Sequence, residues 1–168
     1  MPLLNDEAFM LFDFNANSDL SQWYIVDDVV MGGRSDGDFG LDKDGNGVFY
    51  GEVSLENNGG FSSVQHRFKT REIKEFTHVK LSLRGDGKSY QFRTKTNLGE
   101  PQSYIYKFQT SGEWETIEIP LGEMYPSFRG RKLDMPNYPA EQLSQLSFLI
   151  SNKKAESFRL EIDKIEIY

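Results

Sequence analysis

The sequence predicts an all-β fold, an antiparallel two-sheet sandwich or jelly roll with one short helix at most. Apolar and polar residues alternate in many short runs, the pattern of strands with one buried face. Aromatic residues make up 14% of the chain, with 13 Phe and 8 Tyr, which favours sheet over helical bundle. Turn signals recur roughly every 8 to 12 residues, as in sandwiches. We expect residues 1–168 to form a single domain.

The clearest strand is His78–Arg84, in which apolar residues at alternate positions face one way. Tyr90–Thr96 alternates in the same way, and the GDGK sequence between the two runs predicts a tight hairpin that pairs them. Pro139 precedes the only predicted helix, Ala140–Gln145. The other predicted strands are Phe9–Phe14, Trp23–Val30, Val48–Leu55, Phe61–Phe68, Tyr104–Phe108, Trp114–Ile119, Leu146–Ser151 and Phe158–Tyr168.

Two segments depart from the regular pattern. In the last run the apolar residues change parity between Ile162 and Ile165, which predicts a β-bulge at Asp163 or Lys164. The stretch Leu121–Tyr138 has no strand pattern, and irregular segments of this length are often functional.

The composition excludes several classes of protein. A net charge of -7 argues against nucleic-acid binding through the overall field, and the absence of cysteine excludes disulfides and thiolate chemistry. No apolar run is long enough to span a membrane. The first residues, MPLLNDEAFMLFDF, resemble neither a signal peptide nor a transit peptide, so the sequence predicts a cytoplasmic chain.

No catalytic constellation is apparent. Asp27 and Asp28 are adjacent in a predicted strand and would point to opposite faces, so they cannot act together on one substrate. His66 and His78 lack partners at metal-ligand spacing. An EF-hand-like start at Asp42 lacks its closing glutamate, so a hairpin turn is expected there. An uncharacterised enzyme is therefore the third hypothesis, after two kinds of binding module.

The polar faces of several predicted strands are basic. If these strands are neighbours, one sheet carries a positive surface; the alternative is an ordinary solvated face. The residues are Arg67, Lys80, Arg84, Arg93, Lys95 and Lys107, interleaved with Gln65, Gln91 and Gln109.

The stretch VDDVVMGGRSDG, Val26–Gly37, combines acidic, apolar and glycine residues. We expect the apolar residues at positions 29–31 to plug one end of the sandwich, while Gly32 and Gly33 let the backbone approach the segment Gly59–Phe61. The aspartates would then form a charge network, either structural or part of a ligand site. Its predicted arginines are Arg34, Arg129 and Arg131.

The sequence resembles the complex I intermediate-associated protein 30 family in motifs that occur in order along nearly the whole chain. They are WYIVDDVVMGGRSDG (Trp23–Gly37), FYGEVSLENNGGFSSVQ (Phe49–Gln65), RGDGKSY (Arg84–Tyr90), Trp114 with Ile119 and Pro120, FRGR (Phe128–Arg131) and SFRLEIDKI (Ser157–Ile165). The resemblance implies a jelly-roll sandwich with no established enzymatic activity, similar to galactose-binding and carbohydrate-binding domains. It also implies a role like that of the eukaryotic members, which assist the assembly of respiratory complex I in mitochondria.

Two further expectations follow from the resemblance. Carbohydrate-binding jelly rolls often hold a structural calcium between an early loop and the last strand, where this chain has Asp13 and Asp163; no other cofactor is expected. The preferred function is a non-catalytic assembly or chaperone-like factor that binds a protein partner, such as respiratory subunits. The alternative is sugar binding, for which Tyr104, Tyr106 and Trp114 could serve as a platform, although their alternation favours a place in the core instead.

The residues predicted to bind the partner or ligand share positive charge or membership of the two motif loops. They are Asp27, Asp28, Met31, Gly32, Gly33, Arg34, Ser35, Arg67, Arg84, Arg93, Lys107, Arg129 and Arg131.

Overall fold

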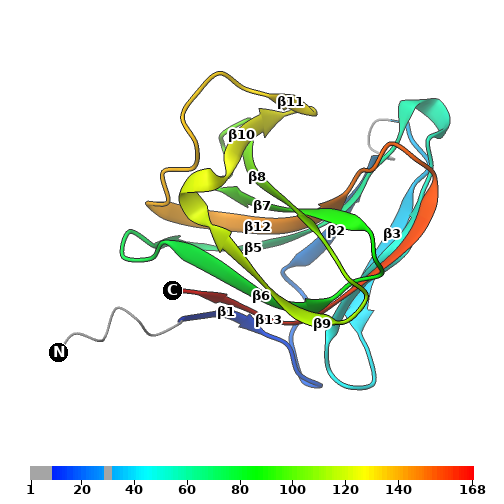
Figure 1. Ribbon diagram of the computed structural model, residues 1–168, viewed down its shortest axis with the longest axis horizontal. Coiled ribbons are helices and arrows are strands. Elements are labelled where there is room, and N and C mark those ends of the chain that lie inside the picture. The colour runs from blue at the N-terminus through cyan, green and yellow to red at the C-terminus, as the bar shows by residue number, and fades with distance from the viewer. Residues whose placement is uncertain (1–8, 29–31) are drawn as a thin grey trace.

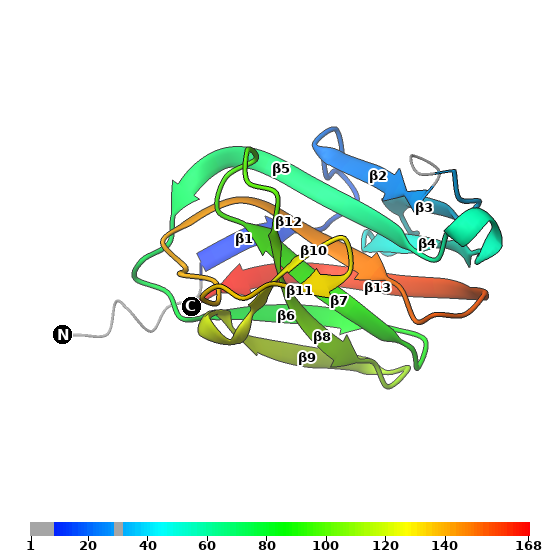
Figure 2. The ribbon, with the colours of Figure 1, turned by 90° about the horizontal axis from the view of Figure 1, so that it is seen from above.

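Two antiparallel β-sheets face each other, which confirms the predicted fold class. The computed structural model describes residues 9–28 and 32–168. One sheet has the strand order β3-β4-β13-β6-β9, with β1 also paired to β13, and the other has the order β11-β10-β8-β7-β12-β5-β2. Figure 1 shows β1, β6, β9 and β13 below β5, β7 and β12, and Figure 2 shows the same layers from above.

The described strands are mostly short. Those of the six-stranded sheet are β1 (Phe9–Asp13), β3 (Asp36–Leu41), β4 (Gly47–Val53), β6 (His78–Arg84), β9 (Trp114–Pro120) and β13 (Glu156–Ile167). Those of the seven-stranded sheet are β2 (Trp23–Asp27), β5 (Ser62–Glu72), β7 (Ser89–Lys95), β8 (Ser103–Gln109), β10 (Tyr125–Phe128), β11 (Arg131–Lys132) and β12 (Gln142–Ile150). The 3-10 helices η3 (Glu56–Asn58) and η4 (Leu121–Glu123) are single turns.

The core lies between the sheets and is built from alternate residues of the facing strands. Val79, Leu81 and Leu83 of β6 are fully buried, as the alternation predicts. Leu146 and Phe148 of β12 pack against them from the other sheet as part of one continuous cluster. The two sheets therefore share one apolar core, and the packing in this core fixes the position of the strands that carry the outward-pointing side chains.

The helix predicted over Ala140–Gln145 is wrong. The chain enters β12 at Gln142, and β12 pairs with β5 on one side and β7 on the other. Leu143 is fully buried. Hydrogen bonding on both edges and burial on the inner face stabilise the strand, and this tertiary context overrides a weak local helix preference.

The predicted hairpin between His78–Arg84 and Tyr90–Thr96 is also wrong. β6 pairs with β9 and β13, whereas β7 pairs with β8 and β12 in the other sheet. The connecting residues cross between the sheets, and Thr110 holds them through bonds with the amide of Gly87 (3.1 Å) and the carbonyl of Lys88 (2.7 Å). A glycine-rich tetrapeptide can thus change sheets instead of reversing the strand within one sheet.

The β-bulge predicted at Asp163 or Lys164 is confirmed, and its position has a structural reason. The β13–β6 register shifts between Ile162 and Lys164. On the other edge of β13, Ile162 pairs with β4, whereas Lys164 pairs with Asp13 of β1. The bulge therefore lies where β13 changes partner, and the freed carbonyl of Asp163 accepts a hydrogen bond from the amide of Phe14 (2.9 Å).

Across residues 9–28 and 32–168, no helix combines the length and apolar character that a membrane crossing requires.

Candidate functional site

The motif VDDVVMGGRSDG is organised around the carboxylate of Asp28, which is 1% exposed. Its Oδ1 accepts a hydrogen bond from the amide of Ser35 (2.9 Å). Its Oδ2 accepts bonds from the Ser35 hydroxyl (2.6 Å) and from the amides of Gly60 (2.6 Å) and Phe61 (3.3 Å). Burial raises the pKa of this carboxyl, but the four hydrogen bonds outweigh it and leave the pKa below its ordinary value.

Two glycines make room for this carboxylate. A Cβ added to Gly33 would lie 2.4 Å from the Cγ of Asp28, and a Cβ added to Gly59 would lie 2.5 Å from its Oδ2. Gly33 of the MGGRS segment and Gly59 of the GGF segment therefore both pack against the carboxylate of Asp28, which lies between the two segments. Met31 and the two valines before it, predicted to plug the sandwich, lie outside the described residues.

Asp27 is directed to different partners from those of Asp28. Its Oδ2 accepts a bond from the amide of Gly37 (2.8 Å) and its Oδ1 accepts one from the hydroxyl of Ser62 (2.5 Å). Each carboxylate thus fixes its own pair of backbone segments. Neither is placed to share a substrate with the other.

The predicted ion pairs between these aspartates and arginine do not form among the described residues. Asp27 ends β2 at one edge of the seven-stranded sheet, whereas Arg129 and Arg131 lie at the opposite edge. Five strand spacings separate β2 from β10, which is about 24 Å across a flat sheet. Arg34 is exposed and lines a shallow surface hollow with residues of β4 instead.

The FRGR sequence is a β-hairpin turn and not an irregular loop. Phe128 pairs with Arg131, which leaves a two-residue turn of Arg129 and Gly130. Both turn residues have positive φ, 51° and 79°, as a type I′ turn requires. The turn joins β10 and β11, two strands that the sequence did not predict.

The six predicted basic residues do not form one surface. Lys80 and Arg84 point outward from β6 in the six-stranded sheet, where Arg84 binds Glu161 through both Nε (2.8 Å) and Nη2 (3.2 Å). The other four point outward from the seven-stranded sheet, since they lie on β5, β7 and β8. The two groups therefore face away from each other, because β6 and β7 belong to different sheets.

We define the cationic face as the outward-pointing residues in the middle of the seven-stranded sheet. It contains four cations and neither aspartate nor glutamate, in a chain with 26 acidic residues. Its members, identified from strand register, are Tyr24, Val26, Ser63, Gln65, Arg67, Gln91, Arg93, Lys95, Ser103, Ile105, Lys107, Tyr125, Ser127, Gln145, Ser147 and Leu149.

One row of cross-strand partners crosses the whole cationic face. Tyr24 of β2 and Tyr125 of β10 are its ends, and Arg93 of β7 lies near its middle. In order, the row is Tyr24, Gln65, Ser147, Arg93, Ile105 and Tyr125. Ser147 and Ile105, although they point away from the core, are buried. The side chains around them therefore cover the floor of the face.

The guanidinium of Arg93 lies in this covered floor without a complete set of partners. Its Nε is buried and has no hydrogen-bond acceptor among the described residues. Burial lowers the pKa of Arg93, and the nearby Tyr125 acts in the opposite sense. The amide oxygen of Gln91 is likewise buried without a donor. Two unpartnered polar atoms therefore lie on β7 within the face.

Two other cations of the face, Arg67 and Lys95, are held by neighbours. Arg67 donates from Nε to Gln145 (3.2 Å) and from Nη2 to Gln65 (2.9 Å), and its guanidinium lies 5.0 Å from the centre of the Tyr24 ring. Lys95 donates to two carbonyl oxygens of the loop that follows β7. These contacts pre-position the positive charges around the row.

The three aromatic residues considered for a sugar platform lie apart, and the core placement that the alternation favours holds for the two tyrosines. Tyr104 is buried in the core, and Tyr106 packs against the core from the same face of β8. Trp114 is 45% exposed, but it lies on β9 in the other sheet, where Arg84 stacks on it at 5.5 Å. The exposed aromatic residue on the cationic face is Tyr24, 38% exposed, which the sequence did not single out.

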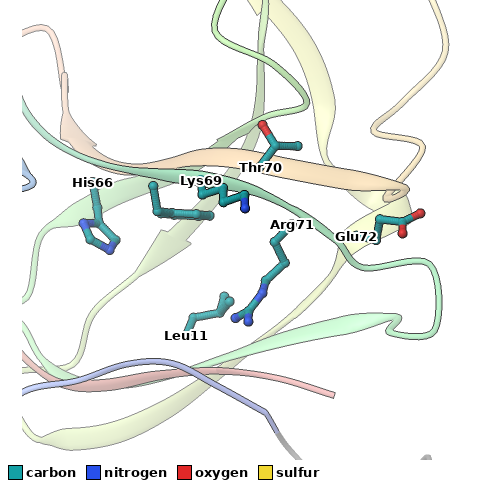
Figure 3. Close-up of a pocket in the computed structure, with 7 residues that line it drawn as sticks. Leu11, His66, Lys69, Thr70, Arg71 and Glu72 are labelled. Carbon is teal, nitrogen blue, oxygen red and sulfur yellow. The ribbon is translucent and has the colours of Figure 1, made fainter.

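A cavity of about 420 Å³ opens at one end of the sandwich, between β5 and β1. Figure 3 shows Arg71 of β5 extending towards Leu11 of β1 across this space, with His66 at the other end of the cavity. Phe68 also lines it. This cavity mixes charged and apolar side chains and was not predicted.

The imidazole of His66 is fixed and uncharged in this end of the core. It stacks on Trp23 with ring centres 4.4 Å apart, and its Nδ1 lies 3.2 Å from the carbonyl oxygen of Gln22. A carbonyl oxygen only accepts, so Nδ1 carries the hydrogen. Burial lowers the pKa of His66, which the bond to Gln22 only partly offsets.

Asp13 and Asp163 lie near each other on the paired strands β1 and β13, since Asp13 pairs with Lys164, the residue after Asp163. In the part of the chain that the structure describes, no group of three or more His, Cys, Asp or Glu side chains is placed to hold a metal ion. The structural calcium stays a prediction.

Comparison with known proteins identifies relatives of the whole chain. The family model described as complex I intermediate-associated protein 30 matches residues 12–162. The mouse protein named "Complex I intermediate-associated protein 30, mitochondrial" is 24% identical over 99% of this chain, and the alignment covers 58% of the mouse protein. A probable mitochondrial member from Caenorhabditis elegans is 27% identical over 71% of this chain and 36% of its own length. This chain thus spans little more than half of the mouse relative.

The fold is similar to that of a solved carbohydrate-binding module. The family 11 module of a cellulosomal cellulase of Clostridium thermocellum superposes with a TM-score of 0.71, covering 96% of this chain and 94% of the module. The sequences are 15% identical, so the likeness concerns the fold alone.

The predicted cytoplasmic location is wrong. The mouse and nematode relatives are named as mitochondrial proteins, which contradicts it. The prediction had been based only on the composition of the first residues.

Proposed function

Since the chain belongs to the complex I intermediate-associated protein 30 family, we propose that it is a non-catalytic module that binds a protein partner during assembly of a respiratory complex. The observation that carries this proposal is the cationic face, which has four cations and no acid in a chain of net charge -7. Complementary charge steers partners and fixes their register. The rigid sheet holds these charges in place without needing a ligand to order them.

The predicted loops take a smaller part in this proposal. The Asp28 network ties the MGGRS segment to residues 60–61, and we assign it a structural role at the β2 edge of the sheet. The Arg129–Gly130 turn extends the opposite edge. Both edges border the cationic face, so a partner lying across the strands would reach from one to the other.

The experiment is affinity capture of the tagged, full-length chain from mitochondria, followed by mass spectrometry. We expect respiratory complex I subunits or their assembly intermediates to be enriched. The variant Lys107→Glu, on the cationic face, should reduce this enrichment, and Lys153→Glu, at an exposed position of the turn between β12 and β13, is the matched control. Capture without respiratory subunits, or an equal loss in both variants, would reject the proposal.

The second candidate function is sugar binding on the same face. Tyr24 offers an exposed ring at one end of the row, with amide and hydroxyl groups beside it. A related solved module was obtained in complex with a β-1,3-1,4-mixed-linked tetrasaccharide. Binding of that tetrasaccharide to this chain, measured by calorimetry, would support this candidate, and its absence together with successful protein capture would eliminate it.

A further inference from the structure

We propose that Arg93 is the centre of a carboxylate-recognition site, which receives an aspartate or glutamate side chain from an acidic segment of the partner protein. This inference rests on the proposed function and specifies the chemistry of its contact. The segment would lie across the strands, along the row that runs from Tyr24 to Tyr125.

The first argument is the unfilled hydrogen-bonding capacity of Arg93. Its Nε is buried and has no acceptor among the described residues. A buried donor without a partner costs roughly 1–3 kcal/mol, more when it is charged. Folding leaves this cost uncompensated. Because Nε is closed to solvent in the free chain, the side chains over it must shift for an acceptor to reach it, and the bond that then forms would remove the cost.

The second argument is the absence of a competing carboxylate on the face. No acidic residue is among the outward positions that define the cationic face, and the outward carboxylate of β5, Glu72, lies five positions beyond Arg67 at the far end of that strand. Arg84, on the other sheet, shows what such a partner looks like, because Glu161 binds its Nε and Nη2 together. Arg93 has the same fork without the glutamate. A carboxylate supplied by another molecule would match that geometry with two parallel bonds.

The third argument concerns the surroundings of the fork. The Gln91 amide oxygen, two residues along β7, is a buried acceptor without a donor. A peptide offers backbone N–H donors beside an acidic side chain, so one extended segment could satisfy both atoms. The fixed positive charges of Arg67 and Lys95 favour an anion in the same region.

The test is an NMR titration that follows the Nε–H resonance of Arg93 in the ¹⁵N-labelled full chain. The probe is the blocked peptide acetyl-Gly-Glu-Gly-amide, and its isostere acetyl-Gly-Gln-Gly-amide is the control. We expect the glutamate peptide to shift the Arg93 resonance in a saturable way and the glutamine peptide to bind at least about tenfold more weakly. The resonance of Arg84, already paired, should stay in place.

Variants distinguish recognition by the planar guanidinium of arginine from simple attraction by a positive charge. Arg93→Lys keeps the charge but loses the planar fork, so affinity for the glutamate peptide should fall roughly tenfold. The same change on the other sheet, Arg159→Lys at an exposed position of β13, should leave binding within about twofold of the parent. If Arg93→Lys does not fold, the two peptide titrations on the unmodified chain still decide the question.

Each outcome bears on the inference. An Arg93 resonance that neither peptide shifts, or that both shift equally, would overturn it. A shift by the β-1,3-1,4-mixed-linked tetrasaccharide at lower concentration than by the glutamate peptide would assign the face to sugars and overturn it as well. A selective glutamate response without capture of respiratory subunits would keep the carboxylate site and reject only the proposed assembly role.

Discussion

Replacing Asp28 by asparagine tests whether its carboxylate holds the β2 edge of the sandwich together. An amide can place its nitrogen at the position of Oδ1 or of Oδ2. At Oδ2 it would face the amides of Gly60 and Phe61, so the better placement is at Oδ1, where it faces only the amide of Ser35. The variant then loses the bond from the Ser35 amide, because two donors, that amide and the new side-chain NH₂ group, face each other. The bonds that remain at the other oxygen no longer involve a charge.

The expected cost follows from these contacts. A lost bond to a buried charged acceptor, with an amide left unpaired, amounts to roughly 2–3 kcal/mol of the free energy of unfolding. For a chain of this size that corresponds to a decrease in Tm of about 5–10 °C. Asp134→Asn, at an exposed position, is the control and should change Tm by less than about 1 °C.

The pH dependence provides a second reading from the same assay. Because the hydrogen bonds lower the pKa of Asp28 in the folded state, the unfolded state binds the proton more readily. The stabilisation is therefore complete above the ordinary pKa of about 3.8 and is lost as the pH falls through the folded value. The difference in Tm between the parent and Asp28→Asn, measured by calorimetry, should be largest at pH 7 and should decrease towards pH 3. A Tm decrease below about 2 °C at pH 7, or a difference that does not change with pH, would refute the reasoning.

Three further predictions concern other parts of the fold. Gly33→Ala should destabilise the chain by about 2 kcal/mol in urea denaturation, because its Cβ would overlap Asp28, whereas Gly40→Ala, with open space around it, should cost no more than about 0.5 kcal/mol; equal costs would contradict this. Since burial lowers the pKa of His66, the parent chain should lose stability as the pH falls below about 6.5, and His66→Gln should show a flatter slope between pH 7 and 5; parallel slopes would count against a neutral buried imidazole. Tyr138→Phe removes the donor to a strand carbonyl (2.5 Å) and should cost about 1 kcal/mol, measured by the same denaturation, with no loss indicating that water replaces the hydroxyl.

The alternation of apolar and polar residues correctly predicted features of the fold that are set within a single strand. Alternation identified β6 and its buried residues, and the parity change between Ile162 and Ile165 located the bulge. The helix over Ala140–Gln145 was mispredicted because the pairing of β12 with two distant strands decides its conformation. That residues 1–168 form one domain stays a prediction.

The candidate site was only partly predictable for the same reason. Arg93 and its outward direction follow from the alternation within β7. Its neighbours do not, since they depend on which strands lie side by side, and the sequence placed β6 next to β7 in error. Tyr125 was missed because β10 is four residues long and lies in a stretch without a strand pattern. The sequence did not identify Asp28 as the centre of a hydrogen-bond network, because the donors to its carboxylate lie 7 to 33 positions further along the chain and only the fold brings them together.

The order in which the strands are synthesised has a consequence for the life of the chain in the cell. β12 and β13 follow all the other described strands in the sequence, yet each lies inside its sheet, β12 between β5 and β7 and β13 between β4 and β6. A nascent chain that has reached residue 140 therefore has strands without the neighbours they require, and neither layer can close. Folding must wait for the ribosome to complete residue 167, and a stalled product would present open edges to chaperones and proteases. The cationic face therefore forms only after β12 has been translated, because Gln145, Ser147 and Leu149 of this strand join its two halves.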